Sequence, residues 1–375
     1  MQFPDLFHLS TNDRELASKS IEVILEGQSP GGAYIASPNF ESYRYSWLRD
    51  GAYCAKAMDS VGNFESASRF HRWVEGALLK QKVSAESLIL QLENGEVPEM
   101  DKMLPTRYTL DGSLERFGEV EDSPWPNYQL DGYGIWLHEL GRHHQSLGTV
   151  DFNSEVVDLV ARYLSAAWKT DCFDCWEEIG DGQHASTLAA ISAGIKSAGI
   201  LLGQESYIRK SEEVRDFLLA NFVRNGRFCK GLVDDRVDSS LICLALPFEI
   251  VALDDPRFIK TIDAIRSDLC GKTGGIYRYL GDTYYGGGEW ILLTSWLGWY
   301  DRLSNNENGF ESAKMWVKIQ ATETLDLPEQ STEGVQAPAM IQPWIERWGQ
   351  VATPLLWSHA MYLLMINEGA NKQWI

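Results

Sequence analysis

Two glutamate sites lie about 150 residues apart, and each stands in a setting that suits a sugar pocket. Glu177 follows Trp176 in a segment rich in Gly and Asp, and Glu329 follows Pro328 in the string Leu-Pro-Glu-Gln. Cleavage of a glycosidic bond requires one carboxyl group that protonates the leaving oxygen and another that activates water or attacks the sugar. Aromatic faces stack on pyranose rings, and burial beside tryptophan raises the pKa of a carboxyl group toward that of a working acid. The pair therefore indicates acid–base chemistry on a sugar.

An aromatic block precedes two adjacent charges near the N-terminal end of the chain. Tyr43, Tyr45 and Trp47 alternate with other residues, and Arg49 and Asp50 follow directly. Arg and Asp side chains make directional hydrogen bonds to hydroxyl groups, and an aromatic ring can form the wall of a sugar pocket. The alternative interpretation is a solvated ion pair in a loop.

Three later segments combine aromatic and charged residues. Trp125 comes shortly before a predicted helix, where it is either a platform for a sugar or a residue that packs behind a helix cap. Glu178 adjoins Glu177 in a segment that could also be a simple acidic loop. Arg278 lies between two tyrosines, either as a hydroxyl-binding group or as a surface partner of a nearby Asp. Trp357 begins an apolar helix, and we expect His359, one turn into that helix, to be structural.

The cysteines and the missing motifs argue against a metal or a cofactor. Cys172 and Cys175 form a Cys-x-x-Cys pair, but a zinc site would need a second pair or nearby His ligands. We expect reduced, structural thiols. The chain contains no Gly-rich phosphate loop with its Lys, no Ser/His/Asp elbow and no His-Glu-x-x-His string. We therefore predict that the chain uses no cofactor and no metal.

Charge and composition exclude several classes of partner. Among 375 residues, 33 Lys and Arg stand against 53 Asp and Glu, so the net charge is −20. Such a chain repels phosphate backbones and anionic lipids, and we expect neither nucleic acid nor a membrane as a partner. The first residues lack a basic start followed by an apolar run, and no uninterrupted apolar stretch approaches 18 residues. We therefore expect a cytoplasmic protein.

Helices must position these residues, because apolar residues recur mainly at helical spacing. We predict helices over residues 14–26, 51–60, 64–78, 130–140, 156–168, 185–201, 205–222, 236–248, 255–269, 289–304, 308–324 and 351–367. Strand patterns occur only around 31–36 and 275–285. No linker divides the chain, so we expect one all-α domain over residues 1–375, built as a bundle, a solenoid or a closed toroid. All the candidate residues except Trp357 fall in the long loops between helices, where functional residues often lie.

Taken in this order, the motifs resemble glycoside hydrolase family 15, the glucoamylase and glucodextranase family. The most specific strings are Tyr-x-Tyr-x-Trp-x-Arg-Asp at 43–50, Pro-Glu-Gln at 328–330 and Pro-Leu-x-Trp-Ser-His-Ala at 354–360. The last string is similar to the prokaryotic branch. The resemblance implies an (α/α)6 toroid that removes glucose, with inversion, from the non-reducing ends of α-linked oligosaccharides or polysaccharides. The chain has no room for the N-terminal β-sandwich domain that prokaryotic members usually carry.

The resemblance also implies a role for each candidate residue. Glu177 matches the general acid of the family and Glu329 the general base. The residues that match its substrate-binding positions are Tyr43, Trp47, Arg49, Asp50, Trp125, Trp176, Glu178, Arg278 and Trp357. We expect Glu177 to be protonated and Glu329 to be ionised at neutral pH. An inverting pair stands roughly 6.5–9.5 Å apart, which leaves room for the attacking water.

Three alternatives remain open. The same two carboxyl groups would serve a glucosidase for isomalto-oligosaccharides, dextran or trehalose, so the motifs do not choose the linkage. A non-catalytic sugar-binding domain on the same scaffold is disfavoured, because both carboxyl groups are present. An unrelated helical toroid, such as a lyase, would require the order of the motifs to be a coincidence.

Overall fold

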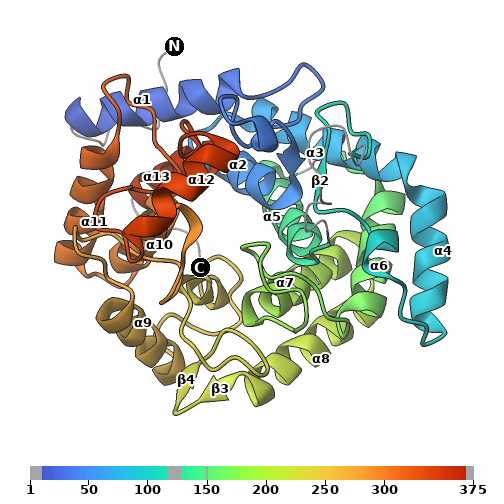
Figure 1. Cartoon of the computed structure of the whole chain (residues 1–375). Coiled ribbons are helices and arrows are strands. Elements are labelled where there is room, and N and C mark those ends of the chain that lie inside the picture. Colours follow the sequence, from blue (N-terminus) through green and yellow to red (C-terminus); the bar gives the residue numbers. More distant parts are fainter. Residues whose placement is uncertain (1–10, 116–127, 149–150, 369–375) are drawn as a thin grey trace.

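Two concentric layers of helices form a closed ring (Figure 1). The computed structural model describes residues 11–115, 128–148 and 151–368. Within them, the inner layer consists of α2 (Leu48–Ser60), α5 (Asp131–Leu147), α7 (Ala185–Leu202), the 3-10 helix η4 (Ser239–Leu244), α10 (Ile291–Leu303) and α13 (Leu356–Asn367). The outer layer consists of α1 (Thr11–Glu26), α3 (Phe64–Lys80), α6 (Ser154–Ala167), α8 (Glu205–Asn221), α9 (Pro256–Asp268) and α11 (Glu307–Gln320). The chain alternates between the layers, so the fold is a single-domain (α/α)6 toroid, and the predicted fold class is confirmed.

The apolar pattern of each helix explains its layer. The outer helix α6 buries one face, with Val156, Val160 and Leu164 inward, as expected of an amphipathic helix. Every residue of the inner helix α13 is buried. The inner helix α7 is the one helix of the described residues that is long and apolar enough to cross a membrane. Because 72% of its apolar stretch is buried inside the ring, its place in the inner layer accounts for this composition.

Three helical segments differ from the sequence-based expectation. The helices α4 (Lys82–Glu93) and α12 (Ile341–Trp348) were not expected, and the segment 236–248 forms only the short η4. Pro247 restricts the residue before it and offers no backbone donor, so an α-helix cannot continue through this segment. The inner ring is closed here by a 3-10 turn in place of a full helix.

The described strands are short. Strand β1 (Ser46–Trp47) pairs antiparallel with β2 (Arg107–Tyr108), and β3 (Val223–Arg224) pairs with β4 (Arg227–Phe228). The segments 31–36 and 275–285, predicted as strands, form only isolated bridges, at Tyr34 and Ile276, and the second segment runs into the 3-10 turn that begins at Tyr284. Four 3-10 turns complete the described elements besides η4: η2 (Glu41–Tyr43), η3 (Met100–Lys102), η5 (Tyr284–Gly286) and η6 (Pro338–Met340).

The inner elements begin at the same end of the ring. The chain enters α2 through β1, α7 through the loop 171–184, and α10 through a loop that ends at Trp290. Backbone N–H groups at a helix start carry partial positive charge and favour nearby carboxylates. This end of the toroid is therefore suited to hold the acidic residues that the loops bring there.

The cysteines are packing residues. All six are free thiols, and five of them are buried. Burial raises the pKa of the Cys172 and Cys175 thiols, so both are held in the unreactive protonated form.

Candidate active site

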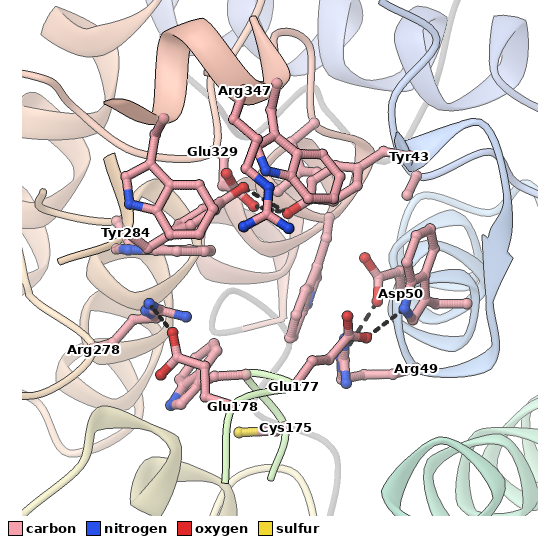
Figure 2. A pocket seen from close by; sticks show the side chains of 18 residues that line it. Tyr43, Arg49, Asp50, Cys175, Glu177, Glu178, Arg278, Tyr284, Glu329 and Arg347 are labelled. Carbon is pink, nitrogen blue, oxygen red and sulfur yellow. Dashed lines mark hydrogen bonds and ion pairs between the residues drawn. The ribbon is translucent and has the colours of Figure 1, made fainter. Parts of the chain in front are cut away.

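A pocket of about 300 Å³ opens at the end of the ring where the inner helices begin (Figure 2). It gathers residues from segments that are far apart in the sequence. Ten of the eleven residues proposed from the sequence line it: Tyr43, Trp47, Arg49, Asp50, Trp176, Glu177, Glu178, Arg278, Glu329 and Trp357. The eleventh, Trp125, lies outside the described residues.

One short segment contacts both candidate catalytic carboxyl groups. The Tyr43 hydroxyl donates to Glu329 Oε1 at 3.0 Å, and the Trp47 indole N–H donates to Glu177 Oε1 at 2.5 Å. The two rings meet edge to face, with centroids 5.5 Å apart. Figure 2 shows Glu329 and Glu177 on facing sides of the pocket. The aromatic block thus fixes the placement of one carboxyl group relative to the other.

Arg49 joins Glu177 to two more carboxyl groups on the floor of the pocket. The guanidinium lies 3.3 Å from Asp50, 3.4 Å from Asp131 and 3.5 Å from Glu177, and it donates to Gln129 at 3.0 Å. Burial raises the pKa of Asp50 to about 6, although Arg49 acts in the opposite direction. One cation therefore serves three acidic groups.

A tight turn presents Glu177 to the pocket. Glu177 has φ 66°, a left-handed conformation that costs free energy in a residue with a side chain. Asp174 stabilises the turn, because its Oδ1 accepts from the backbone N–H groups of Trp176 and Glu178, both at 3.0 Å. Although burial opposes ionisation, the ammonium group of Lys230 at 2.8 Å holds the pKa of Asp174 below its usual range.

Arg278 occupies the opposite side of the floor. Its guanidinium forms two 2.7 Å bonds to Asp282 and a 2.6 Å bond to Glu178. Tyr279 also donates to Glu178. Glu178 is thus held by two donors at the edge of the pocket.

The loop that carries Glu329 is anchored by the following helix. The backbone N–H of Leu327 donates to His359 Nε2 at 2.9 Å, and Ser358 Oγ donates to the Pro328 carbonyl at 2.8 Å. His359 is fully buried, and burial lowers its pKa to about 3, so it stays neutral. These contacts give His359 a structural role, in agreement with the expectation from the sequence.

The protonation of Glu329 differs from the sequence-based expectation. Burial raises its pKa to about 8, and the opposing effects of Tyr43, Arg278 and Tyr284 do not offset this. Burial thus opposes the ionised form that a general base requires, whereas we expected this form to be favoured at neutral pH. The sequence marks a carboxyl group but does not reveal that its side chain is only 3% exposed.

Five aromatic or charged lining residues were absent from the predicted site: Tyr284, Trp290, Trp344, Arg347 and Trp348. Tyr284 donates to or accepts from the Tyr43 hydroxyl at 2.9 Å, so it extends the hydrogen bonding around Glu329. Trp344, Arg347 and Trp348 stand at i, i+3 and i+4, a spacing that places three side chains on one helix face. That spacing could have revealed them.

The arrangement points to a class of enzyme. Opposed carboxyl groups among sugar-stacking rings, set at one end of a helical toroid, are the machinery of a glycoside hydrolase. Within the described residues, no group of three or more His, Cys, Asp or Glu side chains is placed to hold a metal ion. The sequence profile of glycosyl hydrolases family 15 matches residues 13–337, and the chain belongs to this family.

Known relatives support the same conclusion. The isomaltose glucohydrolase of Kribbella flavida is 38% identical over 362 residues, which cover 94% of this chain and 92% of that protein. A solved glycosidase variant in complex with glucose superposes with a TM-score of 0.90 at 36% identity, over 96% of this chain and 99% of the other. Trehalase 2 of Sulfolobus acidocaldarius is 22% identical over 74% of this chain and 52% of its own length. These similarities support an α-glucosidase of family 15.

Proposed function

We propose that the protein is an inverting glucosidase that releases β-glucose from the non-reducing ends of short α-1,6-linked oligosaccharides such as isomaltose. The observation that carries the chemistry is the contact of one aromatic segment with both carboxyl groups, Tyr43 with Glu329 and Trp47 with Glu177. This arrangement holds an acid and a base on facing sides of one pocket (Figure 2).

The reaction follows from the two positions. Glu177 donates a proton to the glycosidic oxygen, and the bond between that oxygen and the anomeric carbon breaks. Glu329 takes a proton from a water molecule, whose oxygen attacks the anomeric carbon from the opposite face. Glu329 Oε2 accepts no hydrogen bond from the described residues, so this oxygen is available for that proton. Attack on the opposite face inverts the configuration, and α-linked glucose leaves as the β-anomer.

The charge balance of the floor suits this division of roles. Three carboxyl groups share Arg49, so one of them keeps a proton at lower electrostatic cost than three ionised groups would require. Glu177 is the member of this cluster on the turn that enters the pocket, whereas Asp131 is only 2% exposed. Asp50 also lines the pocket, but Glu177 is the carboxyl group that faces Glu329 across it, so we assign the proton delivery to Glu177 (Figure 2).

Similarity over nearly the whole chain favours the α-1,6 linkage. The isomaltose glucohydrolase matches almost end to end, whereas the trehalase matches over about half of its own length at lower identity. The sequence resemblance to glucoamylases left the linkage open. The catalytic pair is compatible with either linkage, so the preference rests on the relatives.

A substrate panel tests the proposal. We expect isomaltose to give the highest kcat/KM among isomaltose, maltose, maltotetraose and trehalose. We expect Glu177→Gln and Glu329→Gln each to lower kcat by at least about a thousandfold while the fold is retained, because each removes a proton-transfer group. Glucose release by the wild type and circular dichroism of the variants provide the measurement. A clear preference for trehalose would move the assignment to a trehalase, and no release from any sugar would refute the proposal.

A further inference from the structure

Helix α12 forms the outer part of the pocket, although it belongs to neither layer of the ring. Trp344, Arg347 and Trp348 all reach the pocket from this helix, and none of the eight residues of α12 is buried. Arg49 and Arg278, by contrast, are 7% and 3% exposed at the floor. Arg347 is exposed, so it lies at the mouth of the pocket.

Contacts with the neighbouring turns fix α12 in place. Trp344 Nε1 donates to the Thr283 carbonyl at 3.0 Å, and the Tyr285 hydroxyl donates to the Gly349 carbonyl at 2.9 Å. The Trp348 ring stacks on Phe40, with centroids 6.3 Å apart and planes 4° from parallel. The helix is therefore held in place by these contacts, and its apolar side chains pack against the outside of the core while they remain partly exposed.

The guanidinium of Arg347 lies over two indole rings. It lies 5.7 Å from the Trp344 centroid and 5.0 Å from the Trp348 centroid. Stacking uses the face of the guanidinium and leaves its N–H donors directed outward in its plane. No carboxylate of the described residues lies within ion-pair distance of Arg347, whereas Arg49 and Arg278 are both occupied by acidic partners. Figure 2 shows Arg347 directed over the cavity.

We propose that Arg347, stacked on Trp344 and Trp348, binds the hydroxyl groups of the leaving sugar and so determines which glycosides the pocket cleaves. This inference rests on the proposed function, because an exo-acting enzyme places the terminal glucose at the floor and the leaving sugar at the mouth. The net charge of −20 disfavours an anionic partner, so the groups that Arg347 meets are neutral hydroxyls. Arg347 is thus a specificity-determining residue on the side of the leaving group.

The test compares two substrates that share the glucosyl group. In isomaltose the leaving group is a sugar, and in α-glucosyl fluoride it is a fluoride ion. We expect Arg347→Ala to lower kcat/KM for isomaltose by about tenfold or more, the typical effect of losing hydrogen bonds from a charged donor. The same variant should lower kcat/KM for α-glucosyl fluoride by less than about twofold. Arg347→Lys should show an intermediate loss for isomaltose, because it keeps the charge but loses the planar fork.

The controls separate the possible failures. Arg209→Ala removes an exposed arginine from α8, far from the pocket lining, and should give wild-type values for both substrates. Equal losses on both substrates would overturn the proposal by placing Arg347 at the glucosyl subsite, and an unchanged isomaltose reaction would overturn it as well.

Calorimetry keeps the inference testable without turnover. In a Glu177→Gln background, Arg347→Ala should weaken the binding of isomaltose by about tenfold and leave the binding of glucose unchanged. A wild-type protein that cleaves neither isomaltose nor α-glucosyl fluoride would refute the proposed function. The affinity ratio of isomaltose to glucose would still decide the role of Arg347, and an unchanged ratio would contradict it.

Discussion

At the scale of single residues, the site depends on how much burial perturbs Glu329. The loss of water around this carboxyl group raises its pKa to about 8, while the Tyr43 hydroxyl gives the largest opposing effect. A general base must be ionised to accept a proton from water. The activity of the unliganded enzyme toward substrate should therefore fall as the pH drops through the pKa of Glu329.

The variant Tyr43→Phe tests this dependence. It removes the 3.0 Å hydrogen bond that stabilises the ionised form of Glu329, so the pKa of Glu329 should rise. A hydrogen bond to a charged group contributes about 1.5–3 kcal/mol, which corresponds to roughly one to two pH units. The acid limb of the profile of kcat/KM against pH should shift to higher pH by that amount. Tyr284→Phe should shift the acid limb in the same direction by a smaller amount. An acid limb that Tyr43→Phe leaves unchanged would show that a group other than Glu329 controls the acid limb.

Most of the residues that line the pocket could be predicted from the sequence, because they belong to recognisable motifs. The strings around Tyr43, Glu177, Arg278 and Glu329 pointed to residues that the structure brings to one pocket. The protonation of Glu329 could not be predicted, because burial depends on which distant loops cover the residue. Arg347 was missed because its segment was interpreted as a loop.

At the scale of elements, the turn before α7 determines where Glu177 points. The left-handed backbone at Glu177 is stabilised from outside, by the two backbone hydrogen bonds to Asp174. Lys230 bridges Asp174 and Asp238 at 2.8 Å each, and Asp238 in turn accepts from the Trp176 indole at 3.1 Å. The orientation of the acid thus depends on buried charges behind the turn.

Replacement of Asp174 should impair catalysis indirectly, because Asp174 does not line the pocket. Asp174→Ala removes both backbone hydrogen bonds and leaves Lys230 with one fewer carboxylate, so the turn should relax and Glu177 should lose its position. We expect kcat to fall by at least about tenfold and Tm by several degrees. Asp181→Ala, an exposed position of the same loop, is the matched control and should retain both values. An Asp174→Ala variant with wild-type kcat would contradict a positioning role for this residue.

Helices with one apolar face could be predicted from the sequence, and several other elements could not. In α4, Ala85, Leu88, Ile89 and Leu92 stand at helical spacing, but the exposed apolar residues Val83 and Leu90 interrupt the pattern, and the helix was not predicted. Helix α12 carries a half-buried apolar stripe at Ile341, Trp344, Ile345 and Trp348, but it is only eight residues long and its segment was interpreted as a loop. The segment of η4 is buried on all sides, so its composition does not distinguish a 3-10 turn from an α-helix.

At the scale of the whole molecule, the ring brings together loops that are separated by up to about 300 residues. The hydrogen bond between Tyr43 and Glu329 joins positions 286 residues apart, and it exists only because α13 packs beside α2 and closes the ring. Helix periodicity predicted many helices of similar length but not their closure, since bundles and solenoids show the same periodicity. The toroid came from the family resemblance, and the structure confirms it.

The central claim is that Glu177 and Glu329 act on opposite faces of the sugar, and the product anomer tests it most directly. Isomaltotriose is the suitable substrate, because its first cleavage frees one glucose, from the non-reducing end, and leaves isomaltose. Proton NMR of isomaltotriose with fresh enzyme, recorded early and before mutarotation, distinguishes the two anomers of that released glucose. The account predicts β-glucose as the first product from the wild type and none from Glu329→Gln. The appearance of α-glucose first would contradict the account, because it would require retention through a covalent intermediate.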